Sequence, residues 1–298
     1  MTPPSSSRTG RADLHLHTPG SDGLITVDEW RQAAARRGID IIAITDHDHL
    51  ATVREWCRAG NQIPDDDPGS TVSVIPGIEL TARGRIVHVN VLFGGVIPGN
   101  VPQAGTPLSD IIRWARAIPG TVVVLVHPLP LIWRGQLRRL ARLGLLPDAI
   151  ETRYPLVVGK TDSLERAARR LGIATMGSSD AHLHPDHLGV NLTTFPGQTA
   201  ADLLMAIRHR RTRAHAGHSP RRLPRAVASC QSLSSWLLPL RRIPGVSRLN
   251  RALLLRSRLA TGLGPFPEPS VPAPELRVPA LREAETPASP VAPGTIPG

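Results

Sequence analysis

The chain has 298 residues, 41% of them hydrophobic, so it is long enough to bury the core of one large or two modest domains. Its net charge of +11 is local, because 13 arginines lie between Arg208 and Arg258, a stretch without Asp or Glu. A membrane-spanning or secreted class is not expected, since no apolar run could cross a bilayer, the N-terminus has no signal-peptide core, and Cys57 and Cys230 form no disulfide or metal pattern. We therefore expect a cytoplasmic protein.

Short apolar runs and longer helical patterns alternate along the first two-thirds of the chain. The strands are predicted at residues 12–17, 39–45, 73–80, 85–93, 121–126, 148–153 and 174–179. The helices are predicted at 27–38, 50–59, 108–117, 134–143, 161–171 and 199–210, with Thr26 as the N-cap of the first. This alternation predicts an α/β fold around a parallel sheet, open or closed into a barrel.

The composition divides the chain into four segments. Residues 1–10 are predicted to be a disordered leader and residues 11–217 the folded domain. Residues 218–263 form a basic extension rich in Arg and Leu, and residues 264–298 a Pro-rich disordered tail.

The first predicted strand, in D-L-H-L-H-T-P-G-S-D-G, carries two histidines one residue apart. Alternation along a strand puts His15 and His17 on the same face, about 7 Å apart, with the leucines facing the other way. Two imidazoles on one face suit a metal ion, although this pattern alone more often marks polar residues at the end of a sheet.

Later strands end in the same kinds of residue. Polar side chains follow or close them in I-T-D-H-D-H, P-G-I-E-L, I-V-H-V-N, L-V-H-P and G-S-S-D-A-H. In α/β folds with parallel strands, ligands bind at the carboxyl ends of the strands. Imidazoles and carboxylates ending apolar strands are costly unless they share a partner, so the pattern predicts clustered divalent ions. Mixed His, Asp and Glu ligands without thiolates are typical of Zn, Mn or Fe.

These segments, in this order, resemble the four motifs of the PHP (polymerase and histidinol phosphatase) superfamily. The resemblance covers residues 12 to about 214 and implies a distorted seven-stranded β/α barrel that holds two or three divalent ions. It implies that His15, His17, Glu79 and Asp180 hold the first ion, and that Glu79 bridges to a second bound by His88 and His127. It also implies that Asp22, His47 and His182 hold the third ion. The T-x-x-S-D-G form of the first motif resembles the branch of nucleotide phosphatases and nucleases.

Such a cluster suits phosphoester hydrolysis by a metal-activated hydroxide. Asp46 and Asp48 are the candidates for orienting His47 or for passing a proton to the leaving group, and the alternative role of Asp46 is to cap the next helix. Among many arginines, Arg153 is the preferred phosphate contact because it ends a predicted strand.

We therefore expect a metal-dependent phosphoesterase that acts on a small phosphomonoester or a nucleotide. The first alternative is a nuclease acting on RNA or DNA ends, and the second is a non-catalytic metal-binding regulatory module. The basic segment 241–258 either packs its leucines on the barrel or contacts RNA, DNA or an anionic membrane surface.

Overall fold

The computed structural model describes residues 8–58, 72–84, 86–130, 132–155, 162–219 and 243–266, with single positions between 227 and 240. Within them, nine strands form one sheet: β1 (Thr9–Leu16), β2 (Ile41–Ile44), β3 (Ser73–Thr81), β4 (His88–Leu92), β5 (Val122–Val126), β6 (Ala149–Arg153), β7 (Ala174–Gly177), β8 (Asn191–Pro196) and β9 (Arg213–Ala216). The described α-helices are α1 (Val27–Arg36), α2 (Ala51–Arg58), α3 (Leu108–Arg116), α4 (Trp133–Arg142), α5 (Asp162–Leu171), α6 (Ala200–Arg208) and α8 (Pro244–Ala260). The α/β class is confirmed, with β1 to β7 and α1 to α6 at the predicted places.

The sheet is mixed, which corrects the expectation of a parallel sheet. Its strand order is β7-β6-β5-β4-β3-β2-β1-β8-β9. The β1–β2, β2–β3, β5–β6 and β6–β7 pairs are parallel, but β4 runs antiparallel to both β3 and β5. Only residues 82–87 separate β3 from β4, too few for the crossover that a parallel connection needs.

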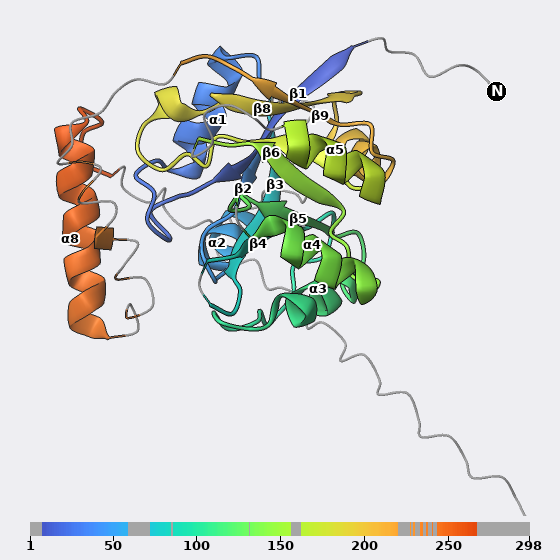
Figure 1. Ribbon diagram of the computed structural model, residues 1–298. Coiled ribbons are helices and arrows are strands. Elements are labelled where there is room, and N and C mark those ends of the chain that lie inside the picture. Colours follow the sequence, from blue (N-terminus) through green and yellow to red (C-terminus); the bar gives the residue numbers. More distant parts are fainter. Residues whose placement is uncertain are drawn as a thin grey trace, which may run out of the picture. The chain divides into compact units, whose positions relative to one another are not determined.

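Two further strands extend the seven that were expected. β8 pairs antiparallel with β1, and β9 pairs antiparallel with β8. Because β8 and β9 also contact β7 at the far edge, the sheet curls into a nearly closed barrel (Figure 1). Neither strand was predicted, since N-L-T-T-F-P and R-A-H-A lack the regular alternation of a half-buried strand.

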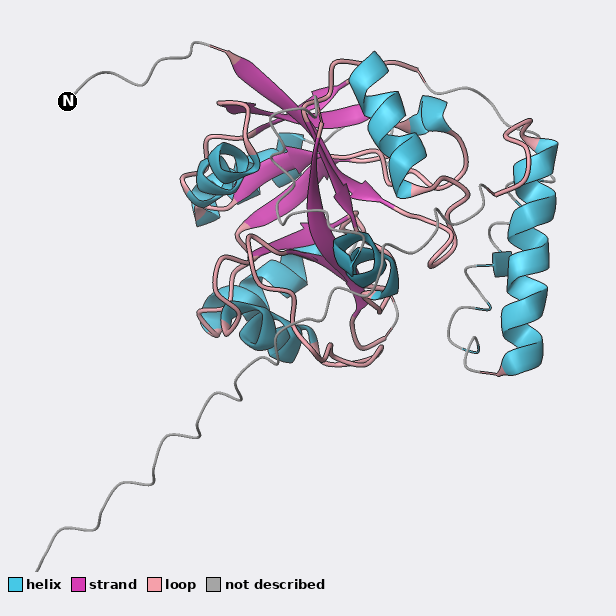
Figure 2. Ribbon diagram, turned by 180° about the vertical axis from the view of Figure 1, so that it is seen from behind, coloured by secondary structure: helices cyan, strands magenta, loops and turns pink. Residues whose placement is uncertain are grey.

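The apolar core has two layers. The inner one joins side chains of the strands, such as Leu14 and Val124, with Leu203 and Ile207 of α6, which contacts β3, β5 and β8. The outer layer packs α1 to α5 around the strands, drawn in magenta at the centre of Figure 2. Apolar side chains of the strands and of α6 thus form one core, and the buried polar side chains of His15, Glu79 and Glu151 lie on β1, β3 and β6.

The segment that contains α8 is joined to the barrel through Arg258. This side chain is 1% exposed and donates hydrogen bonds to Glu29 Oε1 and to the carbonyl oxygen of Leu24, both at 2.5 Å. Leu254 is buried as well, whereas Leu249 and Leu259 are exposed. None of the described helices has the length and apolar character needed to span a membrane.

The division into four segments stays a prediction, and the structure adds two observations at its boundaries. Thr9 and Gly10, placed in the leader by the sequence, belong to β1, and β9 ends at Ala216, one residue before the predicted end of the folded domain. The leader residues 1–7 and the tail from residue 267 lie outside the described residues. The boundary at 263 stays a prediction.

Candidate metal centre

The nine expected ligands come together at one end of the barrel. His15 belongs to β1, Glu79 to β3 and His88 to β4. The other six follow strand ends: His17 and Asp22 after β1, His47 after β2, His127 after β5, and Asp180 and His182 after β7. Four groups of these side chains have ligand atoms within 4.8 Å of one another.

Four of them surround one point. Nε2 of His15 lies 3.1 Å from Glu79 Oε2 and 3.3 Å from Asp180 Oδ1. Nε2 of His17 lies 3.2 and 3.3 Å from the same two oxygens. His15, His17 and Glu79 are all fully buried.

The two oxygens of Glu79 face different neighbours. Oε2 meets His15 and His17, while Oε1 lies 2.8 Å from Nδ1 of His88 and 2.9 Å from Nε2 of His127. A carboxylate in this position can bridge two ions.

A third group surrounds Asp22. Its Oδ1 lies 3.4 Å from Nε2 of His182 and 3.6 Å from Nδ1 of His17, and its Oδ2 lies 3.8 Å from Nε2 of His47. Because Asp22 stands on the turn after β1, it reaches a different side of His17 from the one that faces Glu79.

These contacts fit metal ligation better than hydrogen bonding. Among the described residues, Nε2 of His17 and Nδ1 of His88 are buried without a hydrogen-bond partner, although each lies close to an oxygen of Glu79. Two ligands that each bind one tetrahedral ion at about 2.1 Å stand roughly 3.4 Å apart. The separations of 3.1 to 3.3 Å around Oε2 of Glu79 and Oδ1 of Asp180 are close to this spacing.

The charges of the cluster shift its pKa values strongly. Burial alone would lower the pKa of His17, but Asp180 and Glu79 raise it to about 10. Burial would raise the pKa of Asp22, but His182 and His47 hold it well below its usual range. Without ions, His17 would therefore carry a positive charge beside buried carboxylates.

Three of the four non-glycine residues with a left-handed backbone in the described chain are at this site. They are Asp48 (φ 51°), His127 (φ 26°) and Asp180 (φ 49°). Such conformations cost free energy and persist where the surroundings hold them. Their clustering beside the imidazoles marks the site as functional.

Comparison with known proteins agrees with this geometry. The model of the PHP domain matches residues 13–116, and that of the PHP-associated family matches residues 163–212. The chain carries a PHP domain. It is 36% identical over 81 residues, 26% of this chain and 28% of the relative, to a phosphoribosyl 1,2-cyclic phosphate 1,2-diphosphodiesterase of Eggerthella lenta. It is 28% identical over 160 residues, 51% of this chain and 50% of the relative, to the 5'-3' exoribonuclease Rnm of Salmonella typhimurium.

Solved structures share the fold. A two-domain protein from Bacteroides vulgatus that contains a predicted PHP-like metal-dependent phosphoesterase superposes with a TM-score of 0.52 at 20% identity, over 70% of this chain and 65% of that one. PsfC from Pseudomonas syringae also superposes with a TM-score of 0.52 at 20% identity, over 83% of this chain and 99% of that one. The chain spans half or less of the length of the curated relatives it matches.

In the PHP domain, Asp46 holds the loop that carries Asp22. Its carboxylate accepts hydrogen bonds from Thr18 N and Oγ1, Ser21 Oγ and Thr52 Oγ1, at 2.5 to 2.7 Å. Ser21 Oγ lies 3.3 Å from Asp22 Oδ1 and 3.5 Å from His17 Nδ1. Asp46 thus acts on the ligands through Ser21, and it also contacts α2 through Thr52.

Asp48 and Arg153 have different surroundings. Asp48 accepts hydrogen bonds from the backbone N and Oγ1 of Thr81, and its own N–H donates to the carbonyl oxygen of Glu79. It therefore ties the end of β2 to the strand that carries Glu79. Arg153 closes β6 and is partly exposed, and no described acidic side chain pairs with its guanidinium.

The sequence analysis missed one buried carboxylate that touches the cluster. Glu151 of β6 lies 3.0 Å from Nδ1 of His15, accepts a hydrogen bond from the backbone N of His127 at 2.7 Å, and accepts one from Ser178 Oγ. A single Glu in the strand A-I-E-T-R looks like any strand-end residue. What the sequence could have shown is that Glu151 directly follows an isoleucine within a predicted strand, as Glu79 does.

Proposed function

We propose that this protein is a metal-dependent phosphoesterase that hydrolyses a small phosphomonoester or a nucleotide. The observation that carries the proposal is the position of Glu79. Its two carboxylate oxygens face separate sets of imidazoles, with a third set around Asp22. Clusters of two or more divalent ions are typical of sites that cleave phosphoesters.

The ligand sets are those that the PHP resemblance implies. The distances support them, and they also place His17 in the group of Asp22, His47 and His182. His15, His17, Glu79 and Asp180 would hold one ion. Glu79, His88 and His127 would hold a second. Asp22, His47 and His182 would hold a third. The donors are nitrogen and oxygen atoms, and no thiolate is among the described residues of the site. Such a ligand set suits Mn, Zn or Fe.

The ions, when bound, would lower the pKa of a coordinated water toward neutrality and neutralise the charge of the phosphate. The residues of this chain would then orient the ligands. Glu151 would accept a hydrogen bond from the Nδ1–H of His15, so that Nε2 is free to face an ion. Asp46 and Asp48 would hold the Asp22 loop and the end of β3 in place, and Arg153 would bind the phosphate of the substrate.

A hydrolysis assay tests the proposal. The full chain is reconstituted with Mn and assayed with p-nitrophenyl phosphate, bis(p-nitrophenyl) phosphate and bisphosphorylated nucleotides. His17→Ala should abolish turnover, because His17 contributes to two of the ligand groups. Arg153→Ala should raise KM with a smaller effect on kcat, and Arg36→Ala, an exposed arginine at the end of α1, is the matched control. Metal binding without hydrolysis of any of these esters would instead favour a regulatory module.

A nuclease is the second candidate. It is supported by the names of two curated relatives, each called a 5'-3' exoribonuclease. The preferred substrate decides between the two: a nuclease would cleave short oligonucleotides faster than phosphomonoesters.

A further inference from the structure

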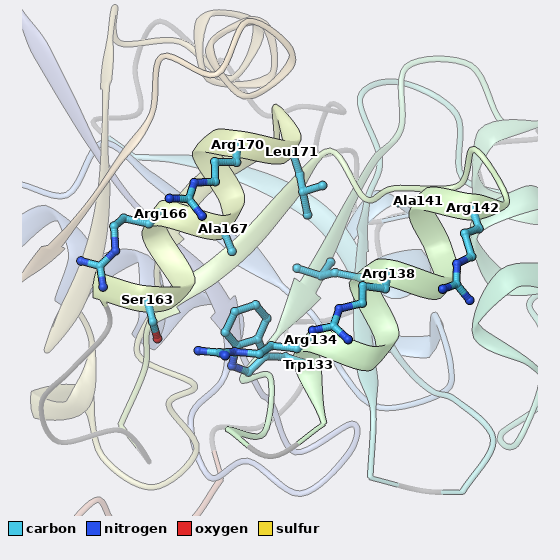
Figure 3. Close-up of a pocket in the computed structure, with 11 residues that line it drawn as sticks. Trp133, Arg134, Arg138, Ala141, Arg142, Ser163, Arg166, Ala167, Arg170 and Leu171 are labelled. Atoms are coloured by element: carbon cyan, nitrogen blue, oxygen red, sulfur yellow. The ribbon is translucent and has the colours of Figure 1, made fainter.

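We propose that the groove between α4 and α5 binds single-stranded nucleic acid. The groove has a volume of about 540 Å³ and is formed only by these two helices (Figure 3). The proposal rests on the second candidate under the proposed function, the nuclease, because it assigns a polymeric phosphodiester as the substrate class of the metal centre.

Arginines dominate the lining of the groove. All five are exposed: Arg134, Arg138 and Arg142 on α4, and Arg166 and Arg170 on α5. On each helix they recur every four residues, so they form a row along one face, about 6 Å apart.

These arginines have no acidic partner among the described residues, and α4 contains no Asp or Glu. The neighbouring Arg169 does have one, since it lies 3.7 Å from Glu165, and it does not line the groove. Five uncompensated guanidinium groups around one hollow repel one another, and a polyanion would relieve that repulsion. Guanidinium groups bind phosphate oxygens in bidentate fashion.

The floor between the two rows is apolar. Trp133 and Leu137 are buried beneath it, and Ala141, Ala167 and Leu171 complete it. The guanidinium carbon of Arg134 lies 5.1 Å from the centre of the Trp133 ring. A planar cation over an aromatic ring is a surface on which a base can stack, and single strands are bound by such surfaces together with cationic rows.

The position of the groove favours a substrate over a partner protein. Trp133, Arg134 and Ser163 lie at the N-terminal ends of α4 and α5, which follow β5 and β6. Only residues 128–132 separate His127 of the metal centre from Trp133. One end of the groove is therefore close in sequence to a ligand, so a strand lying in it could present its end to the ions. An acidic amphipathic helix of a partner protein would match the same charges, but its binding would not benefit from a position near the metal centre.

The test measures binding of a fluorescein-labelled single-stranded oligonucleotide of about 20 nucleotides, long enough for the site sizes of single-strand grooves. Phosphorothioate linkages protect it from hydrolysis by the metal-loaded full chain. Arg138→Ala/Arg170→Ala should weaken binding roughly tenfold and flatten the slope of log K against log salt by roughly 1.4, for two lost phosphate contacts.

The matched control is Arg139→Ala/Arg169→Ala. It removes the same charge from the neighbouring positions of the same helices, outside the groove, and should change binding little. Equal weakening by both variants, or no binding to the wild type, would overturn the proposal. So would a groove variant that loses affinity only for an acidic amphipathic peptide or for anionic vesicles.

Hydrolysis of p-nitrophenyl phosphate or bis(p-nitrophenyl) phosphate by the wild type separates this proposal from the proposed function. Oligonucleotide binding without hydrolysis would retain the groove and refute the phosphoesterase. Hydrolysis without oligonucleotide binding would retain the phosphoesterase and refute the groove.

Discussion

Glu151 is the residue through which β6 supports the metal centre. It contacts His15 through one oxygen and the backbone of His127 through the other, so two expected ligands depend on it. Partners of this kind fix the ring orientation of a ligating histidine. Such a partner raises the affinity of the histidine for the ion without contacting the ion itself.

We expect Glu151→Ala to lower metal affinity roughly 10- to 100-fold, since His15 Nδ1 and His127 N would lose their acceptor. Glu151→Gln, which keeps an acceptor oxygen, should have a smaller effect. Competition with a chelating indicator measures both. Equal affinity in Glu151→Ala and the wild type would show that Glu151 has no positioning role.

The sequence predicted the ligands better than their supports. Most of the nine expected ligands stand near strand ends, where His, Asp or Glu after an apolar run is conspicuous, and the structure brings all nine side chains together. Glu151, Ser178 and Ser21 act through contacts among β1, β6 and the loops that follow β1, β2 and β7. Such contacts depend on strand order, which residue spacing does not reveal.

The loop from Thr18 to Gly23 is the element that positions Asp22. Asp46 accepts three hydrogen bonds from it, and the backbone N of Gly23 donates to the carbonyl oxygen of Thr18. A Cβ on Gly23 would collide with the carbonyl group of His17. The loop can therefore pass close to β1 only with glycine at this position.

We expect Gly23→Ala to displace Asp22, to remove one ion per chain and to destabilise the fold by about 1–3 kcal/mol. Gly99→Ala is the control, because nothing lies near its Cβ position. Metal content and chemical denaturation of the two variants provide the measurement. Full metal content in Gly23→Ala would contradict this account of the loop.

Among the elements, the strands that the sequence predicts have consecutive or alternating apolar residues, as in β5. β8 and β9 have no such pattern. They are strands because β1 offers an open edge to β8 and β8 in turn offers one to β9, and this antiparallel pairing satisfies their backbone groups.

The ion pair of Glu29 with Arg258 joins sequence positions 229 residues apart. Burial would raise the pKa of Glu29, but hydrogen bonds from Arg258 and Thr26 hold it below its usual value of 4.5. Because the pKa is lower in the folded than in the unfolded chain, this stabilisation is present above about pH 4.5 and is lost as the pH falls through the folded-state pKa.

We expect Glu29→Gln to destabilise the protein by about 3 kcal/mol at pH 7, since it leaves a buried guanidinium without its counter-charge. The glutamine keeps the capping interaction with Thr26, so the loss of stability measures the effect of removing the charge. Chemical denaturation should show the difference from the wild type narrowing below pH 4.5. Glu165→Gln, in an exposed pair with Arg169, should cost at most about 1 kcal/mol. An equal effect of the two variants would mean that the segment with α8 does not depend on Arg258.

The most direct test of the metal centre is the number of ions per chain. Elemental analysis would be made on the full chain, purified without a histidine tag and reconstituted with Mn, beside His17→Ala. We predict two or three ions per chain in the wild type and a loss in the variant, because His17 belongs to two of the ligand groups. Fewer than one ion per chain in the wild type would contradict the metal centre itself.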